Sequence, residues 1–183
     1  HARHSLAAPT NLADELSRLA ARNGYATGLS AIHRDQLVVF ALVESVGRIP
    51  AGMAVGSRLP LQPPAGASIM AFKSAPEQSA WLSRAEPHAR PQHKRTLDVI
   101  KEERIGVWGG GAADSTTMDV LSDVVQFLAV SPDSTSLRER IVTLLATLTG
   151  VAYMPEELAR AEPLPVSVIT GPVFDNNGNA SWE

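Results

Sequence analysis

The chain has 183 residues, of which 44% are hydrophobic and 19% charged, proportions that are ordinary for a globular domain with a buried core. Lys and Arg number 16 against 19 Asp and Glu, and the resulting formal net charge of −3 argues against direct DNA binding, because phosphate-binding proteins usually carry a basic face. The absence of cysteine excludes disulfides, thiolate catalysis and cysteine metal sites. No apolar run approaches the ~18 residues of a membrane helix and no signal peptide is visible, so we expect a soluble, cytoplasmic protein without a membrane partner.

The N-terminal part of the chain predicts a helix followed by a β-hairpin. We expect residues 1–10 to be disordered or the remnant of a linker. An apolar stripe predicts a helix over Asn11–Arg22, with Asn11 as its cap. Strands are predicted over Thr27–His33 and Leu37–Val43, joined by a short polar turn. Because the second strand is apolar on both faces, we expect it to lie in a sheet covered on both sides, by helices on one side and by helices or a ligand pocket on the other.

Glycine and proline punctuate the next segment, in which Met53–Val55 is a predicted short strand. A helix is predicted from Ala65 or Gly66 to about Lys73. Small residues at the start of this helix leave backbone N–H groups uncovered, an arrangement that holds carboxylates or phosphates. The same small residues permit close packing of the helix on a sheet, and the sequence leaves both interpretations open.

Two further helices and a strand are predicted in the middle of the chain. The helices cover Pro76–Arg84 and Lys94–Glu103, and the strand covers Ile105–Trp108. The basic run His88–Arg95, which contains a proline and follows another, is interpreted as a solvated loop. The triplet Gly109–Gly111 is interpreted as a flexible turn.

The C-terminal part predicts two amphipathic helices, around Met118–Leu128 and Leu137–Leu148, and a strand over Val166–Thr170. Asp175–Gly178 is a strong turn signal. The chain stops at Glu183 as the returning strand begins, so we expect an unfinished hairpin and further residues beyond it. Together these elements predict an α/β (α+β) fold with a mostly antiparallel sheet and helices on at least one face.

No pattern typical of an active site is present. A hydrolase nucleophile would need a base held in fixed geometry, and no G-x-S-x-G motif occurs. Four histidines lie at the start of the chain or in the basic run, and one ends a strand, so none is a candidate base or metal ligand. No Lys-Ser/Thr pair follows the glycine triplet, which argues against a nucleotide loop. We therefore expect no enzyme activity, no catalytic residue, no metal and no cofactor. The histidines are His1, His4, His33, His88 and His93.

Three strings in a fixed order carry a resemblance to a known family. They are VGSRLPL at 55–61 followed by GASIMAF at 66–72, LDVIKEERIG at 97–106, and ITGPVFDNNG at 169–178. In this order they resemble the C-terminal effector-binding domain of the IclR family of bacterial transcription regulators. The resemblance covers about two thirds of the chain. Two positions depart from the family pattern: Gln62 replaces a histidine and Ala67 replaces a lysine, which favours a more apolar effector.

The resemblance implies a GAF-like fold, with a central antiparallel sheet between helices and an effector pocket. It assigns 11–183 to the effector-binding domain and makes 114–163 a helical insertion, which we interpret as a lid, a dimer surface or an extra layer. It also implies that DNA is bound only through an N-terminal winged helix-turn-helix, which these residues do not encode. The pocket residues it implies are Gly66, Ala67, Met70, Trp108, Val166 and Val168.

The expected function is that of a small-molecule-sensing regulatory domain, which controls transcription through an effector-dependent conformational change. Its partners would be a small organic effector, such as an aromatic or short carboxylic acid, and a second copy in a homodimer or tetramer. The alternative is a GAF-like oligomerisation or protein-interaction domain, whose pocket is filled by large side chains such as Met70 and Trp108.

Overall fold

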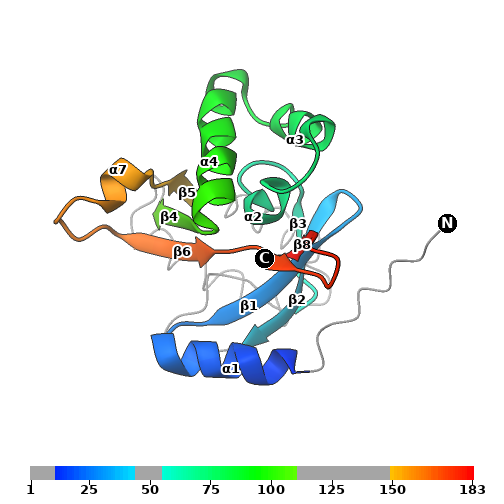
Figure 1. Cartoon of the computed structure of the whole chain (residues 1–183), viewed down its shortest axis with the longest axis vertical. Coiled ribbons are helices and arrows are strands. Elements are labelled where there is room, and N and C mark those ends of the chain that lie inside the picture. The colour runs from blue at the N-terminus through cyan, green and yellow to red at the C-terminus, as the bar shows by residue number, and fades with distance from the viewer. Residues whose placement is uncertain (1–10, 44–54, 111–148) are drawn as a thin grey trace, which may run out of the picture.

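The computed structural model describes residues 11–43, 55–110 and 149–183, and it has the predicted α+β fold, built from helices and antiparallel strands (Figure 1). The helices are α1 (Leu12–Asn23), α2 (Ala67–Met70), α3 (Ala75–Leu82), the 3-10 helix η1 (Pro87–Ala89), α4 (Arg90–Glu103) and α7 (Pro155–Leu158). The strands are β1 (Thr27–His33), β2 (Gln36–Val43), β3 (Arg58–Pro60), β4 (Gly106–Gly110), β5 (Thr149–Ala152), β6 (Val166–Thr170), β7 (Val173–Phe174) and β8 (Ala180–Trp182).

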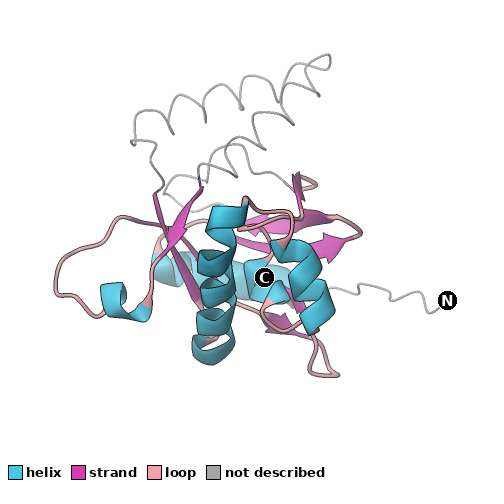
Figure 2. Cartoon of the chain, turned by 90° about the horizontal axis from the view of Figure 1, so that it is seen from above, coloured by secondary structure: helices cyan, strands magenta, loops and turns pink. Residues whose placement is uncertain are grey.

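The strands form two antiparallel sheets that are linked by a very short connection. One sheet has the order β3-β2-β1-β8-β7 and the other has the order β5-β4-β6. Only Gly171 and Pro172 separate β6 from β7, so the chain passes almost directly from one sheet to the other. Figure 1 shows α1 on one side of the β1–β2 hairpin and α2, α3 and α4 on the other. Figure 2 shows the same molecule from above, with α4 between α7 and α3.

The N-terminal helix and hairpin match the prediction to within one residue. Gly24 ends α1 in a left-handed conformation (φ 72°), and its N–H donates to the carbonyl oxygen of Ala20 at 2.8 Å. The inner face of α1 packs on the sheet through a cluster of buried side chains, with Leu12, Ala41 and Val43 at its edge. This cluster consists of Leu16, Leu29, Ala31 and Trp182.

The expectation that β2 is covered on both faces holds for part of the strand. Leu37, Val38 and Val39 are consecutive and all buried, which requires cover on both sides because successive side chains in a strand point to opposite faces. Phe40 is 40% exposed, and its ring meets Trp182 edge-on at a centroid distance of 5.2 Å.

Two predicted loops belong to regular structure instead. The basic run His88–Arg95 is not a loop but lies in η1 and the first half of α4. Pro91 is tolerated there because it occupies the first turn of α4, where a backbone N–H has no partner inside the helix. The glycine triplet is not a flexible turn in its described part: Gly109 and Gly110 lie in β4, while residue 111 falls outside the described residues.

Glycine is required at 109 because a neighbouring ring covers this point of the strand. A Cβ added to Gly109 would lie 2.5 Å from the hydroxyl oxygen of Tyr153 and 2.6 Å from its Cζ. The ring of Tyr153 packed over Gly109 explains why β4 contains a glycine at this position.

The segment around α2 also differs from the prediction. Met53 and Ala54 lie outside the described residues and Val55 lies in a turn, so the strand here is β3, three residues further on. The helix expected to run to about Lys73 ends at Met70. A turn follows, and Ser74 caps the next helix, α3: its hydroxyl donates to Glu77 at 2.6 Å, and its backbone N–H donates to the same carboxylate at 3.0 Å.

The C-terminal third contains a strand that the sequence analysis missed. Both amphipathic helices expected between 111 and 148 lie outside the described residues. The rest of the expected helical insertion holds α7 but also β5, which pairs with β4. The expected unfinished hairpin is wrong, because β8 pairs with β7 on one side and with β1 on the other. A strand of three residues is stable there because it has two partners.

The main core lies between α2, α3, α4 and the three-stranded sheet, with Ile32, Phe72, Leu82, Val99 and Val168 packed at its edge. None of the helices among the described residues is long and apolar enough to span a membrane. The buried residues of this main core are Leu61, Ala67, Met70, Ala71, Trp81, Leu97, Ile100, Trp108, Ala152 and Met154.

Candidate functional site

The start of α2 is shaped by a glycine that no other residue replaces without strain. Gly66 has a φ of 80°, in the left-handed region that favours glycine. A Cβ added to it would lie 2.7 Å from Cδ1 of Leu61. The indole N–H of Trp81 donates to the carbonyl oxygen of Ala65 at 3.0 Å and holds the preceding turn. Backbone N–H groups at the start of α2 are consequently free of side-chain bulk, which is one of the two interpretations that the small residues left open.

A carboxylate from the far end of the chain accepts hydrogen bonds from these N–H groups. The N–H of Gly66 donates to Oε1 of Glu183 at 3.2 Å, and the N–H of Ser68 donates to Oε2 at 3.0 Å. The backbone of Glu183 is fixed by Ser30 on β1 through two hydrogen bonds of 2.7 and 2.9 Å. Burial raises the pKa of the Glu183 carboxyl to about 7, although the backbone N–H groups lower it. The sequence left open whether this helix start holds an anion or only packs closely on the sheet, and it gave no sign that Glu183 supplies a carboxylate here.

Ser68 links α2 to both sheets. Its N–H bonds to Glu183, which follows β8 in the five-stranded sheet. Its hydroxyl donates at 2.7 Å to the hydroxyl oxygen of Thr170, at the end of β6 in the three-stranded sheet. The indole N–H of Trp108 donates to the same oxygen of Thr170 at 3.0 Å. Ser68 is fully buried, so these bonds replace all of its contact with water.

Most of the six residues that the family resemblance implied lie together. Ala67, Met70 and Trp108 belong to the main core, and Val168 packs against it. Gly66 is buried beside them at the start of α2. Val166 is 45% exposed and is not part of this core. The pairing of β4 with β6 shifts by one residue between Trp108 and Gly109, so that Val166 lies opposite Gly109.

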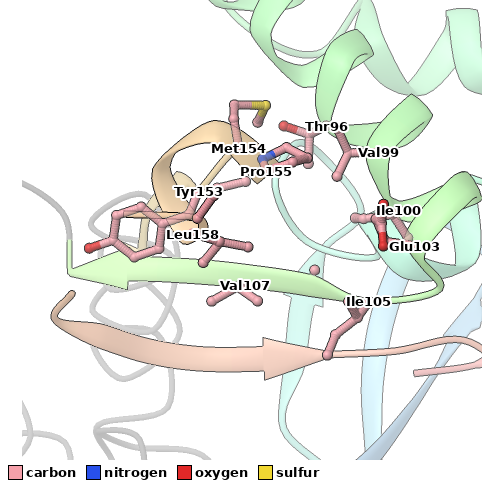
Figure 3. A pocket seen from close by; sticks show the side chains of 13 residues that line it. Thr96, Val99, Ile100, Glu103, Ile105, Val107, Tyr153, Met154, Pro155 and Leu158 are labelled. Atoms are coloured by element: carbon pink, nitrogen blue, oxygen red, sulfur yellow. The ribbon is translucent and has the colours of Figure 1, made fainter. Parts of the chain in front are cut away.

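A cavity of about 290 Å³ opens elsewhere, between α4, β4, β5 and α7 (Figure 3). It shares none of the six expected residues, but Ile100, Ala152 and Met154 form part of both its wall and the main core. Its lining consists of Thr96, Val99, Ile100, Glu103, Ile105, Gly106, Val107, Ala152, Tyr153, Met154, Pro155, Leu158 and Ala159.

Across 11–43, 55–110 and 149–183, no three His, Asp or Glu side chains come together as a metal site would need. His33 and His88 are exposed on the surface. His93 is half-buried against Trp81 at a ring distance of 6.3 Å, and burial lowers its pKa.

Comparison with known proteins gives a likeness of fold. No protein-family model matches the chain, and no curated protein matches it. A solved C-terminal domain of a protein assigned as a transcriptional regulator, from Vibrio cholerae, is similar with a TM-score of 0.50 and 16% identity, over 59% of this chain and 68% of that domain.

Two other solved regulators give lower scores. The IclR of Thermotoga maritima has a TM-score of 0.43 and 18% identity, over 73% of this chain and 66% of that one. An IclR homologue of Microbacterium hydrocarbonoxydans, solved with 4-hydroxybenzoate, has a TM-score of 0.46 and 14% identity, over 52% of this chain. The chain spans only 43% of the length of the Microbacterium protein. The described residues share the α+β fold of the Vibrio cholerae domain.

Proposed function

We propose that the chain is the ligand-responsive regulatory domain of a bacterial DNA-binding transcription regulator, and that its effector is a small organic carboxylic acid. DNA would be bound by a winged helix-turn-helix outside these 183 residues, and the regulator would act in the cytoplasm as a homodimer or tetramer. The shared fold with regulator domains supports the first part of this proposal.

One observation carries the choice of effector: the Glu183 carboxylate lies on two backbone N–H groups beside an apolar wall. Gly66 and Ser68 supply these N–H groups. Met70, Trp108 and Val168 supply apolar surface in the adjoining core. An aromatic or short aliphatic acid presents the same combination, a carboxylate next to hydrocarbon. It would bind by taking the place of the Glu183 side chain.

Such a replacement would also give the domain two arrangements. With Glu183 in place, hydrogen bonds join the end of β8 to α2. With an effector in place, these hydrogen bonds would be lost, while the hydrogen bond from Ser68 to Thr170 would remain. A ligand changes an equilibrium only by binding one arrangement better than the other. An acid effector would favour the arrangement in which β8 is no longer bonded to α2 through Glu183.

The test is a thermal-shift screen of matched acid and alcohol pairs, including 4-hydroxybenzoate and 4-hydroxybenzyl alcohol, on the wild type and on Glu183→Ala. Removing the internal carboxylate frees the N–H groups of Gly66 and Ser68, so acids should bind Glu183→Ala more tightly than the wild type, whereas alcohols should bind both alike. A ligand at a hundred times its Kd stabilises the fold by about 2.7 kcal/mol, which such a screen resolves. The exposed Glu86→Ala serves as the matched control.

A second candidate is an assembly domain with a filled pocket. Met70 and Trp108 are each only 4% exposed, and Glu183 already satisfies the polar groups of the site. This candidate predicts a stable dimer or tetramer in sedimentation velocity and no shift with any acid, in the wild type or in Glu183→Ala. A saturable shift with an acid would reject it.

A further inference from the structure

The cavity between α4 and α7 is built from one face of a regular helix. Thr96, Val99, Ile100 and Glu103 follow the spacing i, i+3, i+4, i+7, so their side chains line one face of α4. The opposite wall comes from α7 and the floor from β4 and β5 (Figure 3). The cavity is therefore bounded by two helices and two strands of regular structure.

Polar contacts hold α7 in place as the outer wall. Arg95 on α4 pairs with Glu156 on α7 at 2.5 Å. The carboxylate of Glu157 accepts the N–H of Met154 at 2.8 Å and caps the start of α7. The N–H of Tyr153 donates to the carbonyl oxygen of Val107 at 2.8 Å and fastens the chain before α7 to β4. These contacts fix α7 opposite α4.

The lining has one charged group, and that group is negative. The hydroxyl of Thr96 donates to the carbonyl oxygen of Gln92 at 3.0 Å, and that of Tyr153 donates to the carbonyl oxygen of Pro165 at 3.2 Å, so the proton of each hydroxyl is already donated. Among the described residues, the carboxylate of Glu103 has neither an ion pair nor a hydrogen bond. The rest of the side-chain lining is hydrocarbon from valine, isoleucine, leucine, alanine, proline and methionine, together with the ring of Tyr153.

We infer that this cavity is a second binding site, which takes a small apolar amine whose ammonium group pairs with Glu103. The hydrocarbon part would lie against Val99, Val107 and Leu158. A cavity of roughly 150 Å³ holds benzene, so about 290 Å³ accommodates a ring with a short aliphatic arm. The site prefers a cation to an acid, because a ligand carboxylate would face Glu103. It shares no residue with the site proposed for the acid effector and stands independently of that proposal.

The experiment is isothermal titration of the full chain with three probes that share a phenylethyl group: 2-phenylethylamine, 2-phenylethanol and 3-phenylpropionate. The amine should bind saturably, the alcohol more weakly, and the acid least. Glu103 is exposed, so Glu103→Gln should weaken amine binding only about two- to fivefold, the range for a solvent-exposed ion pair, and leave alcohol binding unchanged. Glu102→Gln, an exposed neighbour on α4 that does not line the cavity, should change neither.

A filling variant tests the location. Leu158 and Ile105 line the cavity and are each 42% exposed, so tryptophan at either position should fill the space without disturbing the core. Leu158→Trp and Ile105→Trp should abolish binding of both the amine and the alcohol, while Leu19→Trp on α1 should not. The inference is overturned if the amine fails to bind the wild type, if the acid binds as well as the amine, or if binding survives both filling variants.

Discussion

Replacing Glu183 with glutamine tests whether the carboxylate at the start of α2 governs the pH dependence of stability. Burial raises the pKa of Glu183 from 4.5 to about 7 in the folded protein. The native state then binds the proton more tightly than the unfolded chain. The stability from this group is fully present below pH 4.5 and is lost as the pH rises through 7.

The magnitude follows from the two pKa values. The difference between 4.5 and about 7 corresponds, at about 1.4 kcal/mol per pH unit, to a loss of ~3 kcal/mol in the free energy of unfolding across this range. Burial lowers the pKa of His93. The contribution of His93 to the free energy of unfolding therefore changes in the opposite direction: it is lost as the pH falls. The difference between wild type and Glu183→Gln removes the contribution of His93, because both proteins contain it.

The assay is urea unfolding between pH 4.5 and 8.5, followed by tryptophan fluorescence. The wild type should lose stability relative to Glu183→Gln as the pH rises, with most of the change between pH 5 and 7.5. Glu86→Gln, at an exposed position, should follow the wild type. If wild type and Glu183→Gln keep a constant difference across the whole range, Glu183 does not titrate in this environment and the reasoning is refuted.

Two further substitutions test hydrogen bonds around the same elements. Thr170→Val leaves the buried indole N–H of Trp108 and the hydroxyl of Ser68 without their acceptor, which should cost about 1–3 kcal/mol in urea unfolding; Thr170→Ser keeps the oxygen and should recover most of that loss. Ser74→Ala removes the cap of α3 and should cost about 1 kcal/mol. Hydrogen bonds from Ser74 lower the pKa of Glu77, so the Glu77 carboxyl should titrate at higher pH in Ser74→Ala, as followed by NMR.

Local patterns in the sequence predicted the elements that depend on local forces. The helix α1 and the strands β1, β2 and β6 were predicted to within one residue, because an apolar stripe or alternation and a turn residue bound each of them. The turn at Asp175–Gly178 also formed as its residues indicated. Such signals lie within a few residues of the element they define.

Elements that depend on distant partners were missed or misjudged. The strand β5 is only four residues long and gains its stability from pairing with β4. At the start of α2 the small residues were compatible with either an anion site or close packing, and Glu183 was not predicted as a partner. Glu183 is 115 residues from Ser68 along the chain, and no local pattern marks a carboxylate for a partner at that distance.

The helix α2 has four residues, far fewer than the roughly 12 that an isolated helix needs in water. Its amide hydrogens are thus protected from exchange with solvent only while the surrounding structure holds it. Ser68 receives that support from both sheets at once, through its N–H and through its hydroxyl. The exchange rate of the Ser68 amide should therefore report how often α2 separates from Glu183, and would make this residue a built-in probe of opening between α2 and the end of β8.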